Sequence, residues 1–169
     1  MPRLIVMRHA KSDWEGSYAV DFDRPLATRG RRAAARMGRW LRESDIVPQR
    51  VLCSPAERTR ATIRLVCESA GLGHGIVRFV PEIYDARLEA LVAVVGAASD
   101  AVQTLMLVGH NPGLEDLLRW LVPGVRTGED GKLMPTGTIA DLDLDDAWSA
   151  LAPGCARLRQ LVRPRDLDD

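Results

Sequence analysis

The sequence RLIVMRHA, residues 3–10, is a short apolar run that ends abruptly in Arg8 and His9. The run is short and contains β-branched residues, so it predicts a buried strand over residues 3–8. A cation beside an imidazole at the end of such a strand has two explanations. Either the strand has simply reached the surface, or Arg8 and His9 bind an anion there.

Short apolar runs alternate with longer helical patterns along the rest of the chain, which predicts an α/β fold with a mostly parallel sheet. Thr28, Ser54 and Asn111 are expected as helix N-caps, and Gly71 is expected to end the second helix. The further strands are expected at residues 51–53, 76–80, 104–109, 138–144 and 155–162. The helices are expected at residues 28–44, 54–71, 86–99 and 111–122.

The strand ends carry the residues that suggest a function. In sheets of this kind, ligands bind beyond the carboxyl ends of the strands. Arg8 and His9 follow the first strand, Arg58 lies in the first turn after the second, and His110 follows the fourth. These side chains should therefore face one edge of the sheet, with Arg58 turned toward solvent in a cleft. Arginine binds phosphate oxygens bidentately, so a phosphoryl group fits this edge, and a neutral His9 has a nitrogen that can attack phosphorus.

The composition limits the other classes of function. The 169 residues are 46% apolar and 27% charged with a net charge of zero, which suits one domain over 1–169 and disfavours nucleic acid as a partner. No apolar run approaches the roughly 20 residues of a membrane span, and no signal peptide is recognisable. The scattered Cys53, Cys67 and Cys155 form no disulfide framework or zinc pattern. We therefore expect a cytoplasmic protein that does not bind membranes.

Four short motifs follow one another along the chain. They are Arg8-His9-Ala10, Arg24-Pro25-Leu26, Ser54-Pro55 with Arg58, and Gly109-His110-Asn111-Pro112. In this order and strand context they resemble the histidine phosphatase superfamily, and most closely its small SixA-type phosphohistidine phosphatases. The resemblance covers residues 3 to about 144. It implies a phosphoglycerate mutase-like α/β fold, a three-layer sandwich with helices on both faces of a mostly parallel sheet.

The resemblance also implies roles for individual residues. His9 would be the nucleophile that forms a phosphohistidine, and Arg8 and Arg58 would hold the phosphoryl group. His110 would stabilise the transition state, and Arg24 would make a further phosphate contact. The implied enzyme is a hydrolase that uses no metal ion and no cofactor.

Two features of the sequence leave this assignment open in part. The superfamily usually has Gly where this chain has Ala10, and a positive φ at that position would strain an alanine. The general acid is also unsettled: Glu82 lies at the place where larger relatives carry a glutamate, while Asp85 and Asp21 are alternatives.

The length of the chain bears on the substrate. Only 51 residues separate Arg58 from His110, and the expected helix, strand and helix fill them, which leaves no room for the helical lid of larger relatives. An open site suits a phosphohistidine on a signalling or phosphotransfer protein, and we expect the enzyme to be a monomer. A small-molecule phosphomonoesterase of the same superfamily and a non-catalytic phosphate-binding module are the alternatives.

Overall fold

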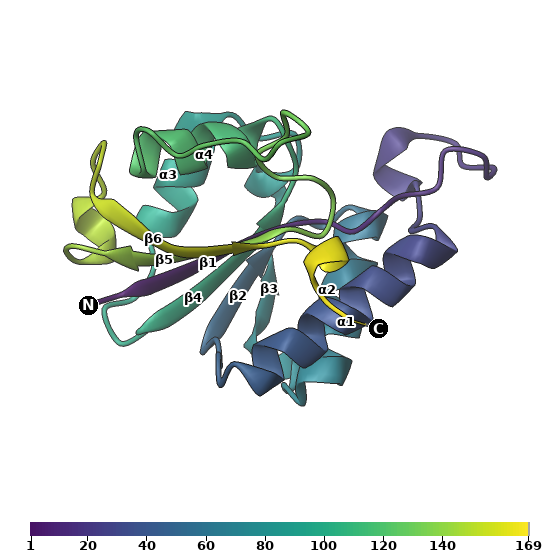
Figure 1. The fold of residues 1–169 in the computed structure, drawn as a ribbon, viewed down its shortest axis with the longest axis horizontal. Coiled ribbons are helices and arrows are strands. Elements are labelled where there is room, and N and C mark those ends of the chain that lie inside the picture. Colours follow the sequence, from purple (N-terminus) through teal and green to yellow (C-terminus); the bar gives the residue numbers. More distant parts are fainter. Residues whose placement is uncertain (169) are drawn as a thin grey trace.

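The computed structural model of the protein describes residues 1–168, in which six strands form one sheet with the order β3-β2-β4-β1-β5-β6 (Figure 1). The four strands from β3 to β1 are parallel, whereas β5 and β6 are antiparallel additions at one side. The strands are β1 (Arg3–Arg8), β2 (Arg50–Cys53), β3 (Val77–Phe79), β4 (Thr104–Gly109), β5 (Ile139–Leu144) and β6 (Ala156–Val162). The helices are α1 (Thr28–Glu43), α2 (Glu57–Ala70), α3 (Leu88–Gly96) and α4 (Gly113–Leu121).

The helices form two layers, with α1 and α2 on one face of the sheet and α3 and α4 on the other (Figure 1). The first strand shows why both faces must be covered. Successive strand residues point to opposite faces, so Ile5 and Met7 pack in the core under α1 and α2, while Leu4 and Val6 pack in the core under α3 and α4. The predicted three-layer sandwich is confirmed.

The parallel strands end level with one another, and this alignment creates the site. Arg8 at the end of β1 is paired in register with Gly109 at the end of β4, and Cys53 at the end of β2 is paired with Val108. His9, Ser54 and His110 therefore leave the sheet side by side.

Three helices, α2, α3 and α4, begin two or three residues later than the sequence indicates. Ser54 and Asn111 are not N-caps, because α2 begins at Glu57 after Ala56 and α4 begins at Gly113 after Pro112. The expected cap at Thr28 is also wrong, since Thr28 is already helical and Ala27 precedes the helix without a side-chain cap. The expected end at Gly71 is confirmed, with φ of 73° in the left-handed region.

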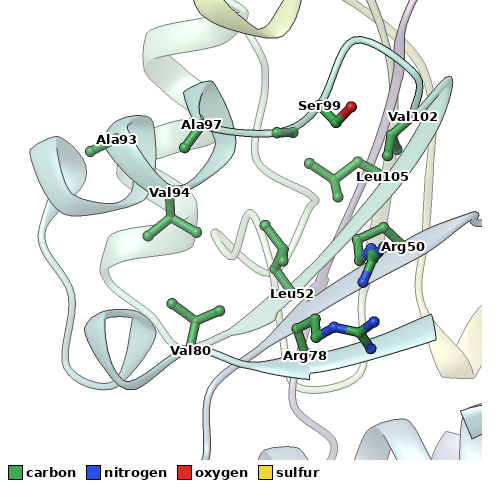
Figure 2. Close-up of a pocket in the computed structure, with 11 residues that line it drawn as sticks. Arg50, Leu52, Arg78, Val80, Ala93, Val94, Ala97, Ser99, Val102 and Leu105 are labelled. Carbon is green, nitrogen blue, oxygen red and sulfur yellow. The ribbon is translucent and has the colours of Figure 1, made fainter. Parts of the chain in front are cut away.

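An apolar pocket of about 550 Å³ lies between α3 and the strands β2 to β4 (Figure 2). Leu52, Val80 and Val94 face one another across it, and Arg50 and Arg78 lie along its strand side. None of the residues predicted for the site lines this pocket. Within residues 1–168, no helix has the length and hydrophobicity needed to cross a membrane.

Candidate active site

His9 occupies the first position after β1 and is almost completely buried. Its backbone N–H donates to the Gly109 carbonyl at 3.1 Å, which fixes it beside the end of β4. Its ring Nδ1 lies 2.7 Å from the carbonyl oxygen of Ala10. A carbonyl can only accept, so Nδ1 carries the proton and Nε2 keeps its lone pair. Burial, together with the positive charges of Arg8 and Arg58, lowers the pKa of His9 to about 3, so the ring is neutral near pH 7.

The second imidazole of the site is His110, whose ring centroid lies 5.3 Å from that of His9. His110 Nε2 is hydrogen-bonded to Ser54 Oγ at 2.7 Å, while its buried Nδ1 has no partner among the described residues. Burial and the charge of Arg58 lower the pKa of His110 to about 4. The ring is therefore neutral near pH 7.

Arg58 is buried, which corrects the expectation that it faces solvent. Its Nη1 donates to the backbone carbonyl of Asp21 at 2.9 Å, and its Nη2 donates to the Asp21 carboxylate at 3.0 Å. These bonds join α2 to the loop that follows β1. The other Asp21 partners are Tyr84, whose hydroxyl donates at 2.9 Å, and Arg24.

The carboxyl group of Asp21 is ionised in this structure. Burial alone would raise its pKa, but hydrogen bonds from Tyr84 and Arg24 and the charge of Arg58 outweigh burial and lower the pKa to about 2. The carboxylate thus stays ionised at any pH near neutrality. We infer that Asp21 positions the guanidinium groups of Arg24 and Arg58, and its low pKa disfavours Asp21 as the general acid.

Arg24 and Arg8 complete the cationic set. Arg24 is buried, donates to Ser12 Oγ as well as to Asp21, and lies 3.7 Å from the centre of the exposed Trp14 ring. Arg8 Nη1 donates to the Met134 carbonyl at 3.1 Å, and its buried Nε has no partner in the described part of the chain. Burial lowers the pKa of Arg8, and so do the like charges of Arg58 and Arg24, because these guanidinium groups lie within electrostatic reach of Arg8.

The carboxylates expected after the third strand do not join this set. Glu82 lies exposed on the short 3-10 helix Pro81–Ile83, and no hydrogen bond or ion pair links it to the imidazoles or arginines. Asp85 is exposed as well and has a positive φ of 54°. Tyr84 is the residue of this segment that contacts the site. Its ring packs edge-on against the His110 ring, with 5.5 Å between the two ring centroids.

The alanine at position 10 fits its place. The only non-glycine residues with positive φ within 1–168 are Asp45 and Asp85, so Ala10 is unstrained. Its side chain is fully buried in the core under α1 and α2, and its N–H donates to Thr62 Oγ1 at 3.1 Å. The backbone needs no glycine here.

Sequence reasoning missed Tyr84 and the role of Ser54. The local pattern indicates a helix cap at Ser54. However, Ser54 follows a strand that is expected to lie beside the strand before His110, and this position could have suggested a hydrogen bond to the His110 ring. Nothing in the sequence signals Tyr84, because the contact depends on how the 81–87 segment brings the Tyr84 ring against His110. Cys53, at the end of β2, is fully buried, and burial raises the pKa of its thiol.

The assembled groups have a definite chemical capacity. A neutral imidazole with a free Nε2 lies beside a second neutral imidazole and three guanidinium groups, all at the carboxyl edge of the sheet. Guanidinium groups neutralise phosphate oxygens, and the imidazole supplies a nucleophile. Within residues 1–168, no three His, Cys, Asp or Glu side chains are placed to hold a metal ion.

Comparison with known proteins identifies the family. The model of the histidine phosphatase superfamily (branch 1) matches residues 4–111, and the chain belongs to that superfamily. An uncharacterised protein of Mycobacterium tuberculosis is 35% identical over 166 residues, which span 94% of this chain and all of the relative. The phosphohistidine phosphatase SixA of Escherichia coli is 27% identical over 147 residues, which span 86% of this chain and 87% of SixA.

Solved structures agree with this assignment. A protein from Nakamurella multipartitia, described as a SixA phosphohistidine phosphatase, superposes with a TM-score of 0.83 at 32% identity and covers 96% of each chain. The fold is shared more distantly by the α-ribazole phosphatase of Shigella flexneri, with a TM-score of 0.61 at 20% identity over 96% of each chain.

Proposed function

We propose that this protein is a phosphatase that transfers a phosphoryl group from its substrate to Nε2 of His9 and then to water. The observation that carries the proposal is the state of His9. It is neutral, its Nδ1 proton is committed to the Ala10 carbonyl, its Nε2 keeps its lone pair, and the charges of Arg8 and Arg58 act on the ring. Such a nitrogen is a nucleophile at neutral pH without help from a general base.

The reaction divides into two displacements. The Nε2 lone pair of His9 forms a bond to phosphorus while the bond to the leaving group breaks, and the leaving atom takes the bonding electrons. Water then attacks phosphorus, the bond to Nε2 breaks, and inorganic phosphate leaves with His9 restored. Arg8, Arg24 and Arg58 balance the charge on the phosphoryl oxygens in both steps.

His110 and Tyr84 have supporting roles in this scheme. His110 lies 5.3 Å from His9 between ring centroids, close enough to stabilise charge on the transferred phosphoryl group, and its bond to Ser54 sets the orientation of the ring. Tyr84 packs on that ring and binds Asp21, so one residue links the second imidazole to the arginines.

We further propose that the physiological substrate is a phosphohistidine on a signalling or phosphotransfer protein. An imidazole leaving group can already carry a proton, so it needs less help from a general acid than an alkoxide does. The exposed position of Glu82 and the ionised state of Asp21 leave the site without an evident proton donor for an alkoxide. Similarity to the SixA proteins supports the same substrate class.

The alternative is a small phosphoester, which the shared fold of the α-ribazole phosphatase favours. A non-catalytic phosphate-binding module is disfavoured, because binding would need the arginines alone and not the paired His9 and His110.

A direct comparison of substrates tests the proposal. Turnover of a phosphohistidine protein and of a panel of small phosphoesters is measured for the wild type and for His9→Ala. We expect kcat/KM at least about tenfold higher for the phosphohistidine protein, and no turnover of either class by His9→Ala. A higher kcat/KM for a small phosphoester would instead select the alternative, and no turnover of any substrate would indicate a binding module.

The proposed chemistry also predicts the response to chelators. The arginines supply the positive charge that the phosphoryl oxygens require, so no divalent ion is needed for that purpose. Turnover of an aryl phosphate should be unchanged after dialysis against a strong chelator. Loss of activity that a divalent ion restores would contradict this mechanism.

A further inference from the structure

A basic pocket of about 570 Å³ opens beside the catalytic residues, on the α1 side of the sheet. Its walls come from the end of β1, the loop that follows β1, the first half of α1, the 130–136 loop, and the segment after β6. A volume of this size is ordinary for a site that binds a small ligand or a single inserted group. We call it the basic pocket; the charged side chains that define it are Arg8, Lys11, Arg29, Lys132, Arg163 and Arg165, with Arg36 and Asp130.

The charge of this pocket is strongly one-sided. Among the residues of 1–168 that line it, seven are basic and one is acidic, although the whole chain has a net charge of zero. The single acid, Asp130, is already paired with Arg163 at 3.5 Å and Arg165 at 3.2 Å. Lys11, Arg29 and Lys132 have no ion pair with a carboxylate of residues 1–168. Like charges in a concave site repel one another, and an anionic ligand relieves that repulsion.

The basic pocket adjoins the catalytic residues at Arg8. Arg8 lines it and is adjacent in sequence to His9. The 130–136 loop, which forms one wall, is held against Arg8 and His9 by two hydrogen bonds. Gly137 N–H, just after the loop, donates to the His9 carbonyl at 2.8 Å, and Arg8 Nη1 donates to the Met134 carbonyl. A molecule whose phosphoryl group reaches His9 can therefore place another of its groups in the pocket.

We propose that the basic pocket binds a second anionic group, a carboxylate or a phosphate, of the molecule whose phosphoryl group is transferred to His9. This inference rests on the proposed function and narrows its substrate class. The second group has two sources: an acidic side chain close to the phosphohistidine of a protein, or a second phosphate on a small molecule. Both present the same chemistry to Lys11, Arg29 and Lys132.

Binding and turnover are measured separately. Calorimetry measures the affinity for a straight-chain alkane bisphosphonate and for the alkyl monophosphonate of the same length. This measurement requires no catalysis. Turnover compares the bisphosphate and monophosphate of matched chain length, and also phosphohistidine peptides with acidic or neutral flanking residues. The variants are Arg29→Glu and Lys132→Glu. The control is Arg32→Glu. Arg32 is exposed on α1, the helix that carries Arg29, but it does not line the pocket, so the substitution makes the same charge change outside it.

We expect the wild type to bind the bisphosphonate about tenfold more tightly than the monophosphonate, a factor that corresponds to about 1.4 kcal/mol. The preference should disappear in Arg29→Glu and Lys132→Glu, persist in Arg32→Glu, and weaken with added salt. Higher kcat/KM for acid-flanked peptides identifies a protein source, and higher kcat/KM for the bisphosphate identifies a small molecule.

Equal affinity for the two phosphonates would overturn the inference, as would a preference that both pocket variants retain. An equal loss in Arg32→Glu would do the same, because it would reflect long-range charge and not the pocket. A failure of the proposed function gives a different result. If the protein prefers the bisphosphonate but hydrolyses no phosphoester, the pocket binds the second anionic group as inferred and the proposed phosphatase activity is wrong.

Discussion

The imidazole of His9 is kept neutral and in one tautomer by two different causes. Burial between strand ends, with neighbouring positive charges, lowers its pKa, and the carbonyl of the next residue takes the Nδ1 proton. The sequence indicates the first cause, because an imidazole after a buried strand is expected to lie at the sheet edge beside Arg8. It does not indicate the second, because that bond depends on the backbone conformation at Ala10.

The lowered pKa values predict how stability depends on pH. In the unfolded chain a histidine binds a proton below about pH 6.5, whereas folded His9 and His110 do so only near pH 3 and pH 4. The unfolded state therefore binds more protons over this interval, and the free energy of unfolding falls as the pH falls. We expect urea denaturation to show a smaller loss of stability between about pH 7 and pH 5 in His9→Asn than in the wild type. His74→Asn, at an exposed position, is the control, and an unchanged pH dependence in His9→Asn would refute the prediction.

Arg58 is expected to affect the rate through both charge and geometry. Arg58→Ala should lower kcat about a hundredfold, because removal of one charged donor to the transition state costs about 3 kcal/mol. Arg58→Lys keeps the charge but cannot make both guanidinium bonds to Asp21, one to its backbone carbonyl and one to its carboxylate. Its rate should therefore lie between those of Arg58→Ala and the wild type. Arg64→Ala changes an exposed arginine of the same helix and should leave kcat unchanged. A folded Arg58→Ala protein with near-normal turnover would remove Arg58 from the site.

At the level of secondary structure, the strands were easier to predict than the helix starts. The apolar runs at residues 3–8 and 104–109 predict the bounds of β1 and β4, because strands that are buried on both faces need continuous apolar sequence. Ser54 and Asn111 have the residue type of a helix cap, but their side chains serve tertiary contacts. Ser54 binds His110, and Asn111 Nδ2 donates to Glu115 and to the Met134 carbonyl. Local pattern cannot distinguish these uses.

Packing between α1 and the loop after β1 depends on Gly30. A Cβ at this position would lie 2.0 Å from the Lys11 carbonyl oxygen, so an alanine must push the helix away from the loop that follows His9. Glycine-to-alanine changes within helices normally stabilise by up to about 1 kcal/mol. We expect Gly30→Ala instead to lower the free energy of unfolding by about 1–3 kcal/mol and to lower kcat.

Gly96 provides the matched comparison, because it is also helical and a Cβ at this position would lie 3.5 Å from its nearest neighbouring atom. Gly96→Ala should be neutral or slightly stabilising in the same denaturation experiment. Equal effects of the two substitutions would show that the contact with the Lys11 carbonyl does not limit packing.

For the molecule as a whole, the layers of the fold were predictable and the assembly of the site was predictable only in part. Alternating strands and helices place Arg8, His9 and His110 at one edge without further information. The contact between Arg58 and Asp21 joins residues 37 positions apart through a loop with no regular pattern. The basic pocket gathers residues from both ends of the chain, so no local motif announces it. Its charge is hidden in a sequence whose net charge is zero.

The covalent intermediate on His9 provides the most direct test of the account. Rapid quenching with phosphorus-labelled substrate at alkaline pH preserves a phosphoramidate, which is stable to alkali and labile to acid. The account predicts label on the peptide that contains His9, no label and no turnover in His9→Ala, and slower turnover with the label still on His9 in His110→Ala. Label on Cys53, or normal turnover by His9→Ala, would contradict it.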